Sequence, residues 1–245
     1  MSESSCKIIS VNIEKDKHHD KVLPFLLHEQ PDIVCMQEIN SSDAERYQYE
    51  LAMQGVFAPM TLEPSNYIVG AFHVQGVAIF SRHRVLRIQT LLYAGYKNRI
   101  PFYVNRDPKT YNHVLLSCDI EKDGGIWTIA TTHFTWTKGG QPDAVQRKNL
   151  ASMLRELKKL PDVVLCGDFN APRGREIFDR LAKKYKDNIP SEITTTIDPI
   201  LHRAPDLQYV VDGLFTSEKY SVGDVRAEIG ISDHKAIVGT VRILQ

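Results

Sequence analysis

Polar side chains able to bind a cation or a phosphate group stand where short apolar runs of this sequence end. In chain order these residues are Asn12, Glu38, His133, Asp168, Asn170, Asp212, Asp233 and His234. Burying such groups one at a time is costly, because each loses its hydration. Convergence around a cation removes that cost. The pattern therefore predicts one site that gathers residues from the whole chain.

Each residue also has a structural explanation when it is taken alone. A carboxylate after a strand is commonly solvated, and a histidine there is commonly hydrogen-bonded within the fold. Asp212 beside Gly213 could be a turn residue. Asp168-Phe169-Asn170 could cap a helix. Independent structural needs do not predict all of these residues in this order, which favours the functional interpretation.

The elements that must position these side chains are mostly strands. Apolar runs of strand length cover residues 7–12, 33–38, 77–81, 85–92, 114–120, 126–132, 163–169, 210–215, 220–228 and 236–243. The turn Asp123-Gly124-Gly125 predicts an antiparallel hairpin, because glycine accepts the positive φ that tight turns need.

Helical spacing of apolar residues predicts helices over 17–29, 43–53, 143–159 and 175–184, with Pro142 at the start of the third. Strand-helix-strand units thus mix with hairpins, which indicates packed sheets with helices outside, in one domain over 1–245. Segments 60–75, 93–112 and 187–206 lack periodicity and are expected to be long functional loops.

Composition limits the environment and the partners. Lys plus Arg and Asp plus Glu both number 30, so no global positive field attracts nucleic acid, and any such binding must be local. The cysteines are expected to be buried free thiols, because their wide spacing fits neither a zinc site nor a disulfide framework. Without a leader or a membrane-spanning run, we expect a cytoplasmic protein, or a nuclear one in a eukaryote. We also expect a monomer.

The motifs around these residues resemble the successive signatures of the endonuclease/exonuclease/phosphatase (deoxyribonuclease I-like) superfamily. They are Ser10-Val11-Asn12, Cys35-Met36-Gln37-Glu38, Thr132-His133, Gly167-Asp168-Phe169-Asn170 and Ser232-Asp233-His234. The resemblance implies an α/β fold, a four-layer helix-sheet-sheet-helix sandwich with two mixed, largely antiparallel sheets. Val11 departs from the family, since many relatives carry a large side chain there. Thr132-His133-Phe134 is similar to the members with histidine rather than tyrosine at this position.

The resemblance also implies a magnesium-dependent phosphoesterase, with Mn²⁺ as a possible substitute, and a role for each residue. Glu38 would bind the metal, with Asn12 and Asp233 completing or orienting its shell. Asp168 would orient and deprotonate the attacking water, and Asn170 would donate to the phosphate. His234, paired with Asp212, would hold positive charge against a phosphate oxygen. His133 would stabilise or protonate the leaving oxygen.

Three hypotheses about the substrate stay open. The first is a phosphodiester in nucleic acid or in a DNA–protein end adduct, as in DNA repair. Trp136 would stack on a base, while Lys138 and Arg173 would contact phosphates. Each of these has a structural alternative, namely packing beneath a loop, solvation, or pairing within the following helix.

The second hypothesis is a small phosphorylated metabolite, nucleotide or lipid head group. The loops 93–112 and 187–206 would shape its pocket with Tyr96, Arg99, Tyr103, Arg106, His202 and Arg203. The third is a catalytically inactive binding module, against which the complete set of site residues argues.

Overall fold

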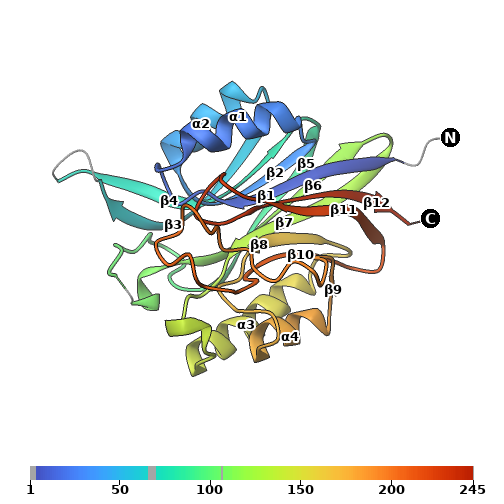
Figure 1. Ribbon diagram of the computed structural model, residues 1–245. Helices are drawn as coiled ribbons and strands as arrows, with labels where there is room; N and C mark the ends of the chain where they lie inside the picture. Colours follow the sequence, from blue (N-terminus) through green and yellow to red (C-terminus); the bar gives the residue numbers. More distant parts are fainter. Residues whose placement is uncertain (1–3, 66–69, 106, 245) are drawn as a thin grey trace.

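Two six-stranded sheets pack face to face between two pairs of helices (Figure 1). The computed structural model describes residues 4–65, 70–105 and 107–244. The first sheet has the order β11-β12-β1-β2-β4-β3. Its strands are β1 Ser5–Asn12, β2 Ile33–Asn40, β3 Gln54–Pro64, β4 Phe72–Ser81, β11 Tyr220–Glu228 and β12 Ala236–Ile243.

The second sheet has the order β5-β6-β7-β8-β10-β9. Its strands are β5 Arg84–Ala94, β6 His113–Lys122, β7 Gly125–His133, β8 Val164–Asp168, β9 Lys186–Asp187 and β10 Asp212–Thr216. Helices α1 His19–Glu29 and α2 Ser41–Glu50 cover the first sheet, and α3 Ala144–Leu157 and α4 Glu176–Ala182 cover the second (Figure 1). The expected four-layer sandwich is confirmed.

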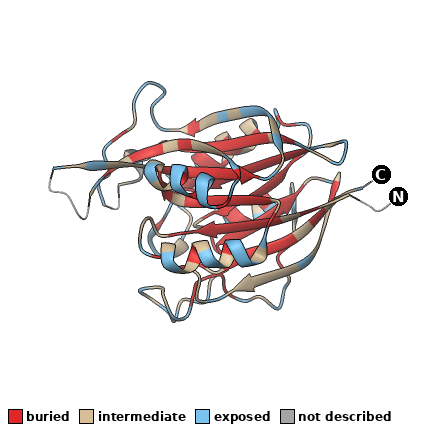
Figure 2. Cartoon of the chain, turned by 90° about the horizontal axis from the view of Figure 1, so that it is seen from above, coloured by how far each residue is buried: buried red, intermediate tan, exposed pale blue. Residues whose placement is uncertain are grey.

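The central strands are buried on both faces, which is why they appear in the sequence as continuous apolar runs (Figure 2). Neighbouring side chains on a strand point to opposite faces. On β1, Ile8 therefore joins the core between the sheets, whereas Ile9 packs under α1 and α2. On β8, Cys166 enters the core between the sheets and Leu165 packs under α3 and α4.

Each sheet contains one parallel pair joined through a helix, and these pairs bring the site together. β1 runs parallel to β2, with α1 between them, and β7 runs parallel to β8, with α3 between them. Their carboxyl ends align, since Asn12 lies opposite Gln37 and His133 lies opposite Asp168. Asp212 begins β10 opposite Asp168 on the other side of β8. The ends of these strands thus deliver polar side chains to one place.

The predicted loop over 60–75 is wrong at both ends, because β3 extends to Pro64 and β4 starts at Phe72; residues 66–69 lie outside the described ranges. β3 is an edge strand that contains Pro59 and Pro64 and is buried at only some positions, so no apolar run marks it. The predicted hairpin is confirmed: Lys122 pairs with Gly125, and Asp123 and Gly124 have φ of 52° and 76°.

The cysteines follow the prediction of buried free thiols. The expected helices all form within a few residues of their predicted bounds. Over the described ranges, none of the helices combines the length and the apolar character that a bilayer crossing requires.

Candidate active site

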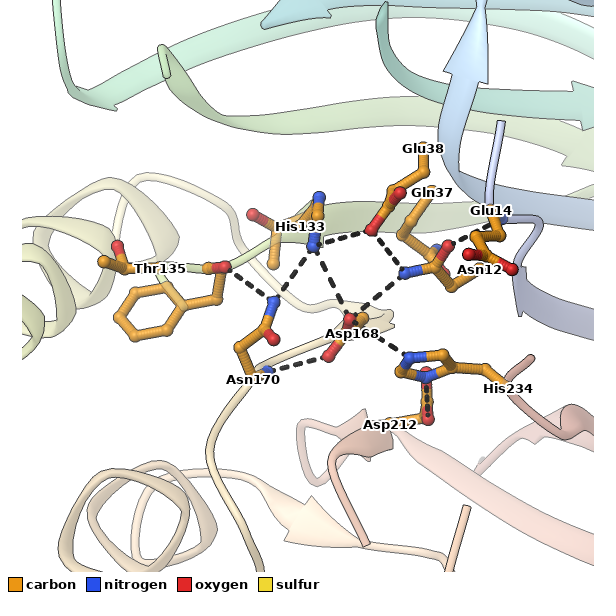
Figure 3. A network of polar contacts seen from close by, with 12 residues as sticks. Asn12, Glu14, Gln37, Glu38, His133, Thr135, Asp168, Asn170, Asp212 and His234 are labelled. Carbon is orange, nitrogen blue, oxygen red and sulfur yellow. Dashed lines mark hydrogen bonds and ion pairs between the residues drawn. The ribbon is translucent and has the colours of Figure 1, made fainter. Parts of the chain in front are cut away.

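The carboxyl ends of β1, β2, β7 and β8 meet at a cluster of buried and half-buried polar side chains (Figure 3). Asn12, at the end of β1, is central to it. Its amide nitrogen donates to Glu38 Oε1 at 3.2 Å and to Asp168 Oδ2 at 3.2 Å. One amide therefore links a carboxylate of the first sheet to a carboxylate of the second.

A bulge in β2 presents Glu38 to this cluster. The pairing of β2 with β4 shifts register between Met36 and Ile39, and Glu38 adopts a left-handed backbone with φ of 55°. This conformation is costly for a residue with a long side chain, and such strain tends to persist where function requires it. The amide of Gln37, fully buried beside it, donates to Thr131 Oγ1 of the facing sheet at 2.9 Å.

Asp168 ends β8, and Asn170 lies in the turn that follows. The backbone N–H of Asn170 donates to Asp168 Oδ1 at 2.7 Å, and Asn170 has a left-handed φ of 48°. The side-chain nitrogen of Asn170 lies 3.0 Å from His133 Nε2 and also donates to the carbonyl of Phe134 at 3.1 Å. These bonds fix the Asn170 amide beside the imidazole of His133.

Gly167 explains how β8 approaches β7 closely enough for these contacts. A Cβ at this position would lie 2.1 Å from the carbonyl oxygen of Thr132, and the φ of Gly167 is 150°. Only glycine fits there. His133 Nε2 then lies 3.5 Å from Asp168 Oδ2 and 3.6 Å from Glu38 Oε1.

His234 and Asp212 form a buried pair on the other side of Asp168. His234 Nδ1 lies 2.9 Å from Asp212 Oδ2, and its Nε2 lies 3.9 Å from Asp168 Oδ2. Burial lowers the pKa of His234, but Asp212 and Asp168 outweigh this effect and raise the pKa well above its usual value. Burial raises the pKa of Asp168, and the positive charge of His234 opposes that rise.

Asp233, Glu14 and His18 form a group of potential metal ligands beside the cluster. One ligand atom of each falls within 4.8 Å of the others, and His18 Nε2 lies 3.0 Å from Glu14 Oε2. Burial raises the pKa of Asp233 to about 7; His234 opposes this, and Glu38 and Glu14 add to it. The sequence analysis missed Glu14 and His18, although Glu14 stands only two residues after Asn12.

Asp198 is a further residue that the sequence analysis missed. It is fully buried, and its carboxylate accepts hydrogen bonds from the backbone N–H groups of Ile200, Leu201 and Gly230 at 2.8, 2.8 and 2.6 Å. Its own N–H donates to the carbonyl of Asp233 at 2.9 Å. Asp198 therefore holds the loop that carries Asp233 and His234.

Two of the predicted substrate-binding residues, Trp136 and Arg173, differ in their surroundings. Trp136 is 45% exposed and follows closely after His133 and Phe134. The guanidinium of Arg173 is used inside the fold: Nη2 lies 3.0 Å from Asp187 Oδ2 and donates to the Ile189 carbonyl at 2.8 Å. This arrangement favours the structural alternative for Arg173. Arg106 lies outside the described residues.

The model of the endonuclease/exonuclease/phosphatase family matches residues 9–234, which include every residue of the cluster. The chain belongs to this family. Its members are phosphoesterases and typically depend on a divalent metal. The hypothesis drawn from the motifs is thus confirmed at the level of the family. No curated protein matches the chain.

Solved structures of the family share the fold along almost the whole chain. A Bacteroides vulgatus member is 17% identical with a TM-score of 0.73, covering 99% of this chain and 100% of its own. The human Nocturnin catalytic domain with bound sulfate is 19% identical with a TM-score of 0.72, covering 98% and 94%. A humanized D. rerio TDP2 is 15% identical with a TM-score of 0.66, covering 97% and 99%.

The side chains present fit a hard divalent cation. Glu38, Asn12, Asp233 and Glu14 offer carboxylate and amide oxygens, which Mg²⁺ and Mn²⁺ prefer, and few of them are needed because magnesium keeps several waters. The Asn12 amide is well placed for this. Its nitrogen is bonded to the carboxylates, and within the described part of the chain its oxygen accepts a single hydrogen bond, from the N–H of Glu14 at 3.1 Å. Burial is the main cause of the raised pKa of Asp233, and a cation would neutralise the charge of Glu38 and Glu14 that adds to it.

Proposed function

We propose that the protein is a magnesium-dependent phosphodiesterase that acts on nucleic acid or on a DNA–protein end adduct. The observation that carries the proposal is the position of Asp168. Its Oδ2 accepts a hydrogen bond from Asn12, which also bonds to Glu38, and lies 3.9 Å from His234 Nε2. Its Oδ1 accepts the N–H of Asn170. Asp168, the proposed general base, thus lies between the proposed metal ligands and the cationic His234. In-line attack of water on a phosphate ester uses a base, a metal ion and a positive charge in such an arrangement.

Each group then has one task. A bound cation, held by Glu38 with Asn12 and Asp233, would neutralise charge on the phosphate. Asp168 accepts a proton from the attacking water, and His234 in its imidazolium form donates to a nonbridging oxygen. Asn170 donates to the phosphate through its amide. His133 stabilises or protonates the leaving oxygen, and its position beside Asn170 supports this role.

Support for a phosphodiester substrate also comes from the family neighbours. ANGEL2, described as a 2′,3′-cyclic phosphatase, was solved with adenosine-2′,3′-vanadate, and it is 13% identical with a TM-score of 0.70. Sulfate is bound in the Nocturnin structure. Trp136 is exposed and follows His133 closely in the sequence, so it is suited to stack on a base.

Hydrolysis of bis-para-nitrophenyl phosphate, with magnesium present and then chelated, tests the chemistry. We expect magnesium-dependent turnover in the wild type. Asp168→Asn and His234→Ala should lose about 10²–10³ in rate while keeping the wild-type circular dichroism spectrum. Full activity in both variants would refute the assigned roles. Absence of any turnover would favour the inactive binding module.

A substrate panel tests the class of substrate. It would contain abasic duplex, single-stranded DNA, phosphotyrosyl-DNA, nucleotides and inositol phosphates. The proposal expects a nucleic-acid substrate to have the highest kcat/KM, with a steep loss of binding as salt rises, because counterions compete for phosphates. A preference for a nucleotide or inositol phosphate would instead favour a small metabolite. Location in the cytoplasm or nucleus and a monomeric state stay predictions.

A further inference from the structure

Lys15 is a cation fixed at the edge of the proposed active site. It follows Glu14 in the turn after β1 with a left-handed φ of 67°, and its backbone N–H donates to the carbonyl of Glu38 at 3.0 Å. Its ammonium is paired with the carboxylate of Glu63 on β3. The side chain of Glu63 is 6% exposed, whereas that of Lys15 is 29% exposed. The carboxylate is therefore enclosed, while the Lys15 side chain stays partly exposed to solvent.

The Glu63 carboxylate is itself held in place. Tyr111 OH donates to Glu63 Oε1 at 3.1 Å, and the Tyr111 ring makes an edge contact with the ring of His133 at 6.4 Å between centroids. Glu63 therefore sets the position of the Lys15 ammonium relative to His133. This arrangement restrains a side chain that would otherwise be mobile, which reduces the entropy cost of an anion contact.

An aromatic ring lies beside this cation. The centroid of the Tyr103 ring is 5.6 Å from Lys15 Nζ, and the ring makes an edge contact with Tyr111 at 5.5 Å. The backbone of Tyr103 is fixed to β3, because its N–H donates to the carbonyl of Leu62 at 2.8 Å. The rings of Tyr103, Tyr111 and His133 thus form a continuous row that ends at the predicted leaving-group residue.

A second cation, Arg203, lies in the loop after β9. Its neighbour His202 makes a ring contact with His234 at 6.3 Å, and Arg203 is exposed and forms no ion pair with any described residue. Burial raises the pKa of Tyr103; Glu63 and Glu38 add to this, and Lys15 and Arg203 oppose it. Tyr103 therefore lies in the electrostatic range of both cations and of Glu38.

We propose that Lys15, Tyr103 and Arg203 form a subsite for the nucleotide that flanks the scissile bond, in which the base stacks on Tyr103 and the next phosphate contacts Lys15 and Arg203. This inference rests on the proposed phosphodiesterase function and narrows its substrate to one with a base and a second phosphate. The second phosphate would be attracted to two cations, Lys15 and Arg203, that lie on separate loops.

Three chromogenic esters test the base contact with Tyr103 separately from the phosphate contact with Lys15 and Arg203. Bis-para-nitrophenyl phosphate has neither base nor second phosphate, thymidine 5′-(para-nitrophenyl phosphate) adds the base, and its 3′-phosphorylated form adds the phosphate. For Lys15→Met and for Arg203→Met, kcat/KM for the third ester relative to the second should fall about tenfold, as expected for a charge-assisted hydrogen bond. Lys15→Arg should keep most of the ratio. Lys97→Met, an exposed lysine on the same loop as Tyr103, is the matched control.

Tyr103→Leu should lower kcat/KM for the second ester relative to the first about tenfold, whereas Tyr103→Phe, which keeps the ring, should not. An equal loss on all three esters would indicate a structural role for these residues and would overturn the subsite. Equal wild-type kcat/KM for all three esters would overturn it as well, while leaving the phosphodiesterase function intact.

A binding measurement keeps the subsite testable if the wild type turns over none of the esters, in which case the proposed function fails on its own. Isothermal titration would compare thymidine 3′,5′-bisphosphate with thymidine 5′-phosphate. The bisphosphate should bind more tightly, and Lys15→Met but not Lys97→Met should weaken it about tenfold. Equal wild-type affinities for the two ligands, or an unchanged affinity in Lys15→Met, would refute the subsite.

Discussion

Asp212→Asn is the most informative single substitution in the site. It keeps the size of the side chain, and its amide oxygen can still accept a hydrogen bond from His234 Nδ1, which lies 2.9 Å from Asp212 Oδ2 in the wild type. It removes the negative charge that is the main cause of the raised pKa of His234, while the burial that lowers this pKa remains. A larger share of His234 is then neutral near pH 7.

The expected loss follows from the role of the imidazolium. A neutral imidazole still donates through one nitrogen but carries no charge, so we expect about 10²–10³ lower kcat/KM near neutral pH, the effect of losing one donor aimed at developing charge. Breaking a buried ion pair costs about 3–5 kcal/mol at most. This lies within the stability of a typical domain, about 5–15 kcal/mol. The variant should therefore fold.

The pH dependence distinguishes this mechanism from simple damage. Activity that requires the imidazolium is lost as pH rises through the pKa of His234, and this pKa is raised in the wild type. In Asp212→Asn the alkaline limb of kcat/KM for bis-para-nitrophenyl phosphate should move to lower pH, and part of the activity should return on acidification. NMR titration of His234 in the metal-free protein should show the same displacement.

A partly exposed carboxylate on the same sheet gives the control. Asp119 on β6 pairs with the guanidinium of Arg87 on the edge strand β5 at 2.8 Å, and Asp119→Asn should leave the pH profile unchanged. An Asp212→Asn profile that is lower at every pH but not displaced would refute the proposed role of His234. A wild-type rate at pH 7 would refute it as well.

Three further predictions concern the parts that hold the site. Glu38→Gln should weaken magnesium activation at least tenfold, measured as the Mg²⁺ concentration for half-maximal rate, because a charged ligand is lost. Gly167→Ala should lower the free energy of unfolding by several kcal/mol, about 3 or more, in urea denaturation, because its Cβ would lie 2.1 Å from the Thr132 carbonyl. Asp198→Ala should reduce kcat and raise hydrogen exchange at Gly230, whose N–H it binds.

The strands could be predicted from the sequence where they are buried on both faces. β12 has the predicted bounds, Ala236–Ile243, because its inner positions are apolar and turn residues flank it. β3 could not be found in this way, since it lies at an edge and contains two prolines. Its position matters for the site, because it carries Glu63, the partner of Lys15.

The candidate site was predictable where one of its residues ends a buried strand. Asn12 and Asp168 are such residues, and the parallel pairs place them at aligned strand ends. Glu14, His18 and Asp198 could not be predicted, because they lie in turns whose shape depends on contacts with distant segments. Asp198, for example, bonds to Gly230, 32 residues further along the chain.

The bulge at Gln37 and Glu38 links the stability of the sandwich to the chemistry of the site. Without the bulge, successive side chains of β2 would alternate strictly between the core and the helices. None of them would then be directed toward the site at the carboxyl ends of the strands. The bulge lets Gln37 bond to Thr131 across the interface while Glu38 reaches Asn12. The left-handed strain at Glu38 is therefore balanced by packing between the sheets. The proposed metal ligand is thus positioned by the same contacts that hold the two sheets together.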